Sequence, residues 1–561
     1  MKIRKHLFSV NYGDPFSFVQ GNRRGIGVFY CMYGKMHSTC LYGIDGVIIQ
    51  VEVDISNGLP QTSIIGLPDS AIREAVERVR AGIKNCGFTF PLQRVTINLA
   101  PADLKKEGSA FDLAIALGIL VTSGQLLLPQ DEKLLLIGEM ALDGSLRPVN
   151  GVLSMVDRAK REGFTAVLLP EENAGEAALI DHMNIYAIRH LNELRQLAAE
   201  LSAADVPGKD QPLRIQTLSP LLKAPAVAAA SVPEHLPAED YADVLGQLHV
   251  KRALTIAAAG MHNIMLIGPP GTGKTMLIKR LPTILPFMTE QEALETTKIF
   301  SAAGKLKEPG SGLIRKRPFR SPHHTISSGG LIGGGTIPKP GEVSLAHRGI
   351  LFLDELPEFN RQVLEVLRQP LEDKTVTISR ARAVHTFPAH FMLAASMNPC
   401  PCGYLGSDHP EHQCTCSFSR IAQYRAKISG PLLDRIDLQV EVPRPKEWST
   451  DAPSLSSAEM RSQVLEAHAR QQQRYGSGYG GWNSELTGSA LRRFARLDSA
   501  SADMLHQTIE TLGLSMRAYD RILKLARTIA DLDGQENIAF NHVAEAIQYR
   551  NLDRPQITGV G

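Results

Sequence analysis

The sequence has few cysteines, few aromatic residues, almost no net charge and no long apolar run. Seven cysteines in 561 residues, four of them between positions 400 and 416, are too few and too clustered for a disulfide scaffold. A net charge of +2 provides no global field, so any binding of nucleic acid must use local basic patches. No apolar run has the length of a membrane-spanning helix, and the basic N-terminus lacks the apolar core of a secretory signal. We therefore expect a cytoplasmic protein.

The order of strand-like and helical segments predicts an α/β protein of several domains. Before position 36 the sequence has neither a helical nor a strand period, and a convincing strand begins only at Tyr42, so Met32 and Met36 are alternative starts. The predicted organisation is an extension foreign to the native chain at 1–35, an α/β domain at 36–201, a linker at 202–237, a second α/β domain at 238–445 with a cysteine-rich insert at 400–416, a linker with a partial helix at 446–485 and a helical lid at 486–552.

A glycine-rich turn between an apolar strand and a helix predicts a nucleotide site. The stretch NIMLIGPPGTGKTMLIKRL fits the pattern G-x-x-x-x-G-K-[ST], in which backbone amides face the phosphates. Lys274 would contact the β- and γ-phosphates, and Thr275 would hold Mg²⁺. ATP and Mg²⁺ are therefore the predicted cofactors. The turn consists of Gly268, Pro269, Pro270, Gly271, Thr272, Gly273, Lys274 and Thr275.

Polar residues at the ends of later segments complete this predicted site. The apolar run ILFLDE ends in Asp354, which suits the magnesium shell, and Glu355, which suits a base that polarises the attacking water. A further strand ends at Asn398, whose amide would orient that water. Arg435 in LLDRID would reach a γ-phosphate, and Arg517 in LSMRAYDR lies on a helix of the C-terminal domain.

These motifs, in this order, resemble an AAA+ ATPase of the magnesium-chelatase-like branch. DVLGQLHVKRALTIAAAG, just upstream, resembles the adenine-side box of that group and implicates Gly246 and Gln247. The resemblance implies that Asn398 is sensor 1, Arg435 the arginine finger and Arg517 sensor 2, and that the subunits form a ring, usually a hexamer. An arginine lent by a neighbour contributes about 10³–10⁵ in rate, so an isolated subunit is expected to hydrolyse ATP slowly.

Two closely spaced cysteine pairs follow Asn398 directly and predict a structural zinc site. Four thiolates suit a closed tetrahedral site. The polar loop between the pairs contains His409 and His412 as rival ligands, and free thiols or a redox pair remain alternatives under reducing conditions. The predicted ligands are Cys400, Cys402, Cys414 and Cys416.

The first α/β domain resembles a degenerate Lon protease domain. IGEMALDGSLRPVNGVL and AKREGFTAVLLPEEN carry the resemblance. In the stretch KKEGSAFD, Ala110 stands where the nucleophile belongs, and Leu153 stands where the catalytic lysine belongs. Peptidase activity is therefore expected to be absent. A shifted dyad of Ser109 and Lys106 remains an alternative, although Lys106 and its neighbour Lys105 look like a solvated pair.

The chain as a whole resembles the YifB/ComM family, on GLIGGGTIPKPGEVSLAHRGILFLDELPEFNR and KISGPLLDRIDL above all. The resemblance implies a hexameric DNA helicase that promotes branch migration in homologous recombination and natural transformation, with recombination proteins as partners. GEVSLAHRGILFLDE is also similar to a block of the replicative MCM helicases. A chelatase-type chaperone that remodels a protein partner is the second reading, and an ATP-dependent protease, which Leu153 disfavours, is the third.

Basic segments supply the residue-level argument for DNA. KTVTISRARAVHTF predicts a β-hairpin with Arg380 and Arg382, where cations would hold passing phosphates in the pore of a ring. Aromatic residues make up only 6% of the chain, which favours phosphate contacts over base stacking. Solvated loop charge is the alternative for each of these residues. A second basic stretch, RKRPFR, adds Arg315, Lys316, Arg317 and Arg320.

Overall fold

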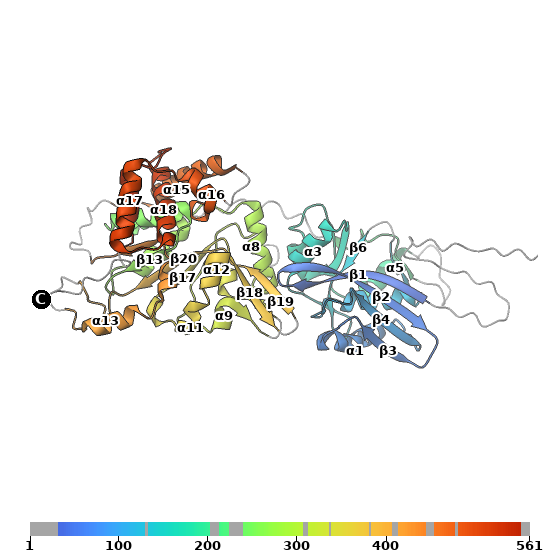
Figure 1. Ribbon diagram of the computed structural model, residues 1–561. Helices are drawn as coiled ribbons and strands as arrows, with labels where there is room; N and C mark the ends of the chain where they lie inside the picture. The colour runs from blue at the N-terminus through green and yellow to red at the C-terminus, as the bar shows by residue number, and fades with distance from the viewer. Residues whose placement is uncertain are drawn as a thin grey trace, which may run out of the picture. The chain divides into compact units, whose positions relative to one another are not determined.

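The computed structural model shows two compact units, which are described separately (Figure 1). The first unit contains the described residues up to 223 together with 297–306 and 312–313, and the second contains the others. Residues 297–306 and 312–313, which the sequence predicted to be part of the second α/β domain, group with the first unit by their contacts. Among the described residues, no helix has both the length and the apolarity needed to cross a membrane. The structure describes residues 32–129, 133–201, 213–223, 239–306, 312–335, 338–380, 383–406, 413–444, 454–476 and 481–550.

Two four-stranded sheets form the first unit. The first sheet has the order β1-β2-β4-β3 and the second the order β12-β10-β9-β6. Alternate residues of β2 are buried, as expected for a strand with one face on a core, and α2 is buried along its whole length. The strands are β1 (Met32–Tyr42), β2 (Asp45–Ser56), β3 (Gln61–Ile65), β4 (Arg94–Ala100), β5 (Leu126–Leu127), β6 (Leu134–Leu136), β7 (Glu139–Met140), β8 (Leu146–Arg147), β9 (Ala166–Pro170), β10 (Asn184–Ile188), β11 (Leu213–Arg214) and β12 (Leu222–Lys223), and the helices are α1 (Ser70–Asn85), α2 (Asp112–Thr122), α3 (Val152–Arg161), α4 (Glu171–Ala177) and α5 (Asn192–Leu201).

Strand β1 corrects one expectation from the sequence. No strand was predicted before Tyr42, but β1 begins at Met32 and pairs with β2 in antiparallel register from Met32↔Ile55 to Tyr42↔Asp45. Its buried positions include Ser38 and Thr39, which hide the apolar alternation that identifies a strand. Ser38 Oγ donates to the carbonyl of Leu136 at 2.7 Å, so its hydroxyl is satisfied inside the core.

The second unit is built on a five-stranded parallel sheet of order β14-β17-β20-β13-β21. The strands β13 (Ile264–Ile267), β17 (Ile350–Leu353) and β20 (Met392–Met397) are buried at every position, which is typical of a parallel sheet covered on both faces. The other strands are β14 (Phe319–Arg320) and β21 (Leu438–Glu441). The prediction of an α/β fold with a parallel sheet between helices is confirmed for this unit.

Shorter elements surround this sheet. The antiparallel pair β18 (Thr375–Arg380) and β19 (Ala383–Pro388) forms the predicted hairpin. The others are α6 (Leu248–Gly260), α7 (Lys274–Lys279), α8 (Glu290–Ala302, which the division of the chain into units splits after Thr296), α9 (Ser328–Ile332), β15 (Gly333–Gly334), β16 (Lys339–Pro340), α10 (Glu342–Leu345), α11 (Arg361–Glu365), α12 (Arg368–Asp373), α13 (Phe418–Arg425) and α14 (Gly430–Leu433), with 3₁₀ turns at Tyr241–Asp243, Leu281–Thr283, Leu356–Glu358 and Asn483–Glu485.

The C-terminal part of the second unit is helical, as the sequence predicts. It contains α15 (Ser457–Tyr475), α16 (Gly488–Phe494), α17 (Ser499–Leu512), α18 (Met516–Leu532) and α19 (Phe540–Gln548). The partial helix expected in the linker is the 19-residue α15, and its buried Met460, Val464 and Ala467 belong to the same core as α6.

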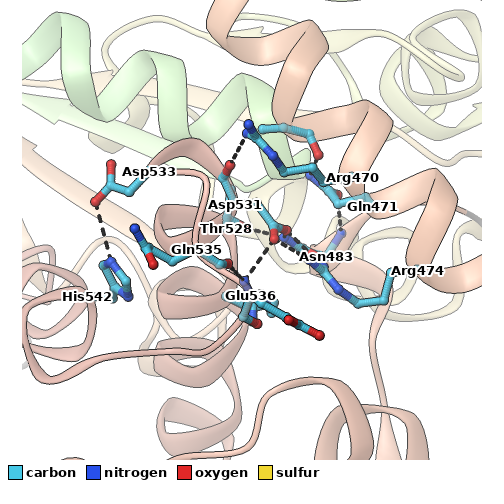
Figure 2. A network of polar contacts seen from close by, with 12 residues as sticks. Arg470, Gln471, Arg474, Asn483, Thr528, Asp531, Asp533, Gln535, Glu536 and His542 are labelled. Carbon is cyan, nitrogen blue, oxygen red and sulfur yellow. Dashed lines mark hydrogen bonds and ion pairs between the residues drawn. The ribbon is translucent and has the colours of Figure 1, made fainter.

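A buried polar network joins these helices (Figure 2). The Asp531 carboxylate on α18 is fully buried and accepts from Arg474 on α15 at 3.0 Å and from Arg527 at 2.9 Å. Asn483 donates to Asp531 at 2.9 Å and to Thr528 Oγ1 at 3.0 Å. Because a buried carboxylate is costly without partners, these bonds specify how α15 and α18 pack.

Candidate nucleotide site

The predicted phosphate-binding turn lies at the carboxyl end of the central strand β13 and leads into α7, which begins at Lys274. A Cβ atom on Gly268 would stand 2.3 Å from the carbonyl oxygen of Val442, so the first position of the turn accepts only glycine. The first amides of a helix have no intrahelical partner, so the start of α7 is a place where phosphate oxygens are favoured.

The two predicted magnesium residues are in contact. Thr275 Oγ1 donates to Asp354 Oδ2 at 2.9 Å, and Asp354 follows β17 directly. The other carboxylate oxygen, Oδ1, accepts from the Ser396 hydroxyl and, at 3.1 Å, from the backbone N–H of Glu355. A hydroxyl next to an oriented carboxylate is a donor set that suits Mg²⁺, so this pair fits the predicted ion. Ser396 was not predicted; its signal was its place two residues before Asn398 on a strand that ends at the site.

Lys274 and Asn398 also meet at this edge. The Lys274 ammonium donates to the carbonyls of Gly268 at 2.7 Å and Pro269 at 2.8 Å, and to Asn398 Oδ1 at 3.3 Å. Burial lowers the pKa of Lys274, while the charges of Asp354 and Glu355 act in the opposite direction. The ammonium is therefore desolvated at the position where the sequence expects phosphate charge.

Gln247, which the resemblance assigned to the adenine side, is connected to the turn through Pro443. Its backbone is left-handed (φ 53°), and its Nε2 donates to the carbonyl of Pro443 at 2.8 Å. The preceding carbonyl, of Val442, is the one that faces Gly268. Within the described part of the chain, the buried Oε1 of Gln247 has no hydrogen-bond partner. A buried acceptor of this kind fits a donor such as an adenine amine, and Gly246 precedes it.

Arg435 lies at the opposite edge of the sheet. β13 and β21 are parallel and pair Ile264 with Leu438, so Asn263 and Asp437 mark the amino edge. Asn263 Nδ2 donates to the carbonyl of Arg435 at 2.8 Å, which fixes Arg435 at this edge. Five residues of strand at about 3.3 Å each separate Asn263 from Gly268, roughly 16 Å. The Arg435 guanidinium, held by Pro431 O and Glu372, therefore cannot contact a phosphate in the turn of its own chain.

Arg517 lies near Arg435. On α18, Arg521 donates to Asp437 at 2.6 Å, which brings the start of this helix to the same amino edge. Arg517, one turn earlier, has its guanidinium 4.0 Å from Glu372. Although burial acts to raise the pKa of Asp437, Arg521 and then His262 hold it well below its usual range. The structure thus brings the two predicted arginines together, far from the turn.

The four predicted zinc ligands also come together. Their sulfur atoms all lie within 4.8 Å of one another, with Cys400–Cys402 at 3.3 Å, Cys400–Cys414 at 3.7 Å and Cys402–Cys414 at 3.6 Å. A tetrahedron of thiolates around zinc at about 2.3 Å needs sulfur separations of roughly 3.8 Å, so the cluster fits this ion. Cys416 completes the set, while the rival ligands His409 and His412 lie outside the described residues.

The cysteine-rich loop touches the phosphate-binding turn. Gly403, next to the predicted ligand Cys402, has a left-handed backbone (φ 85°), and a Cβ placed on it would stand 2.8 Å from Pro270 Cδ. Its backbone N–H donates to the carbonyl of Cys400 at 3.0 Å. The loop that carries the cysteines therefore packs directly on the turn, a contact that no motif indicated.

The predicted DNA contacts are described only in part. β18 and β19 form the hairpin, but Arg382 lies outside the described residues and Arg380 is described by its backbone alone. In the second basic stretch, Arg317 is buried and donates to the carbonyls of Pro286 and Arg348, both at 2.8 Å. Arg320 binds Glu342 through two hydrogen bonds of 2.6 and 2.9 Å. These two arginines are held within their own chain.

In the first unit, Ser109 and Lys106, the alternative protease dyad, bind other residues and not each other. The Ser109 hydroxyl donates to Glu139, and the Lys106 ammonium donates to the carbonyl of Pro101. Lys106 is fully buried, so the expectation of a solvated lysine was wrong for it, and burial lowers its pKa. Leu153, at the position of the catalytic lysine, is buried, and its backbone N–H donates to Glu176 at 2.8 Å.

Three family models match successive parts of the chain. Residues 51–173 match the subunit ChlI of Mg-chelatase, residues 240–450 the magnesium chelatase subunit ChlI, and residues 454–550 the C-terminal part of that subunit. The chain is 42% identical to the competence protein ComM of Haemophilus influenzae and 41% identical to the protein YifB of Escherichia coli. Each alignment covers 92% of this chain and 97% of the relative.

Two weaker matches cover parts of the chain. Lon protease 2 of Bacillus subtilis is 26% identical over 180 residues, which are 29% of this chain and 32% of that protein. The DNA replication licensing factor Mcm2 of Drosophila melanogaster is 25% identical over 241 residues, which are 40% of this chain and 22% of that protein.

Proposed function

Because the chain belongs to the YifB/ComM family of magnesium-chelatase-like AAA+ ATPases, we propose that it is a ring-forming motor that couples ATP hydrolysis to movement along DNA. Its role would be branch migration in homologous recombination and natural transformation, together with recombination proteins in the cytoplasm. ATP hydrolysis follows from membership of the family. Assembly into a ring, movement along DNA and the role in branch migration are what we propose.

The proposal of a ring rests on the position of Arg435 and Arg517. Both arginines are held at the amino edge of the sheet, while Lys274, Thr275 and Asp354 meet at the carboxyl edge. A subunit therefore has the two halves of a complete site on opposite sides. A second copy that docks head to tail would bring its arginines to the first subunit's γ-phosphate, and repeated contacts of this kind close into a ring, for which we propose six subunits.

In this arrangement Glu355 would polarise the attacking water, Asn398 would orient it, and Thr275 and Asp354 would hold Mg²⁺. Magnesium would neutralise charge on the β- and γ-phosphates when bound. The Lys274 ammonium, already next to Asn398, would exchange its bonds to the turn carbonyls for phosphate oxygens. The residues of the turn would bind the nucleotide, and the arginines of the neighbour would complete the charge stabilisation.

The choice of DNA rests on the hairpin and on the names of relatives. β18 and β19 form the hairpin that the sequence predicted to carry Arg380 and Arg382 into the pore. ComM is named a competence protein, and Mcm2 is named a DNA replication licensing factor. Cations that hold phosphates would give binding that depends strongly on salt and weakly on sequence.

The proposal is tested by measuring the ATPase rate with branched DNA, single-stranded DNA, unfolded protein or no addition, and then strand displacement on the branched DNA. We expect DNA to raise the rate and branched DNA to be unwound, with binding that falls steeply as salt rises. Stimulation by unfolded protein alone would instead support the chaperone that remodels a protein partner. Cleavage of the unfolded protein would support the protease.

A further inference from the structure

Glu372 stands between the two arginines of the proposed subunit interface. It lies near the end of α12, and 54% of its side chain is exposed. One carboxylate oxygen binds the Arg435 guanidinium, and the other lies 4.0 Å from the Arg517 guanidinium. Arg435 itself is only 8% exposed, so the carboxylate covers its outer end. A phosphate that approached Arg435 from another subunit would have to displace Glu372.

The same helix leads directly into the hairpin. α12 ends at Asp373, Lys374 turns the chain in a left-handed conformation (φ 57°), and β18 begins at Thr375. A hollow of about 450 Å³ is lined by Glu372 and Arg435 and also by Val376 and Thr377 of β18. Only two residues, Asp373 and Lys374, therefore separate Glu372, whose carboxylate holds the arginines, from the strand proposed to carry the DNA-binding cations.

We propose that Glu372 is a positioning residue that links the nucleotide of a neighbouring subunit to the hairpin, an inference that rests on the proposed function. Without that nucleotide, the carboxylate holds Arg435 and keeps Arg517 near it, and α12 is tied to the amino edge of the sheet. When the γ-phosphate of the neighbour takes the two guanidiniums, Glu372 is released, and α12 and the base of the hairpin are free to shift. DNA on the hairpin would act on the arginines by the same route in reverse.

Glu372→Gln keeps the shape of the side chain and removes the charge that competes with phosphate. We expect the ATPase rate without DNA to rise roughly threefold, which corresponds to an ion pair whose carboxylate is half exposed and screened by solvent. The KM for ATP should fall, because the two arginines no longer have to separate from a carboxylate before they bind phosphate. The ratio of the rates with and without DNA should fall toward one, since the hairpin and the arginines are no longer coupled.

Asp373→Asn is the matched control. Asp373 is the next residue and is exposed, and the described residues show no ion pair for it. It should keep both the rate without DNA and the DNA ratio of the parent chain. Melting temperatures of the three proteins should agree, which separates positioning from folding.

An unchanged or lower rate of Glu372→Gln without DNA would overturn the inference, whatever DNA does. If Glu372→Gln has a raised rate without DNA but the same ratio of rates with and without DNA as the parent chain, the link between Glu372 and the hairpin is overturned. If DNA stimulates none of the three proteins, the proposed function fails, and the rates without DNA still decide whether Glu372 restrains the arginines.

Discussion

The contact between the cysteine-rich loop and the phosphate-binding turn can be tested by adding one methyl group. In Gly403→Ala the new Cβ would stand 2.8 Å from Pro270 Cδ, where carbon atoms normally approach to about 3.5–4.0 Å. Pro270 would have to move by roughly 0.7 Å or more, and its ring has no alternative rotamer to relieve the contact. Overpacking of this kind costs about 1–3 kcal/mol, so the Kd for ATP should rise about fivefold to a hundredfold.

Gly406→Ala is the control for this variant. Gly406 is also left-handed (φ 77°), so alanine adds a similar backbone strain, but its Cβ would meet no atom of the described residues within 4 Å. Both variants should therefore lose stability in thermal melts, Gly403→Ala more because the overpacking adds to the strain, while only Gly403→Ala binds a fluorescent ATP analogue more weakly. Bound zinc should be equal in the two proteins. Equal ATP affinity in both variants would refute the argument that the loop supports the turn.

Two further predictions concern the ring and the metal. Arg435→Ala should bind ATP without hydrolysing it, and Lys274→Ala should lack a working turn. Mixed in equal amounts, they should recover about a quarter of the parent ATPase rate, because that share of randomly formed interfaces joins an intact turn to an intact arginine; no recovery after subunit exchange would contradict catalysis between subunits. For the metal, elemental analysis should find one zinc ion per chain, and Cys402→Ser should lose it, whereas Cys86→Ser, outside the cluster, should retain it. A parent chain without zinc would contradict the site.

Much of the nucleotide site could be predicted because its residues stand in short motifs at strand ends. Asp354 and Asn398 follow adjacent parallel strands, so their carboxyl ends, and with them the side chains, had to meet at one edge. The cysteine cluster was equally visible, since its four cysteines lie within 17 residues of sequence. Local spacing was enough in each case.

Other features depend on contacts that local patterns do not carry. β1 was missed because buried hydroxyls interrupt its apolar alternation. Lys106 was misjudged because most lysines are exposed and the sequence alone does not show which one is buried. Gly403 contacts the site through tertiary packing, which no motif of this sequence records, and the position of Ser396 before Asn398 was its only signal. The described residues from 297 to 313 begin within α8, whose first part belongs to the second unit, but they group with the first unit by their contacts.

The division of the site between two edges is the clearest case of information that lies in topology. The motif order predicts which residues act on the nucleotide but not whether one chain can bring them together. That depends on β21 being parallel to β13, which places Arg435 before the strand and the turn after it. The pairing of Arg521 with Asp437 then fixes the start of α18, and with it Arg517, at the same edge. Since neither arginine can span the strands, a single subunit of this fold cannot bring both arginines to its own turn, and the proposed association with a second copy would do so without a change in the fold.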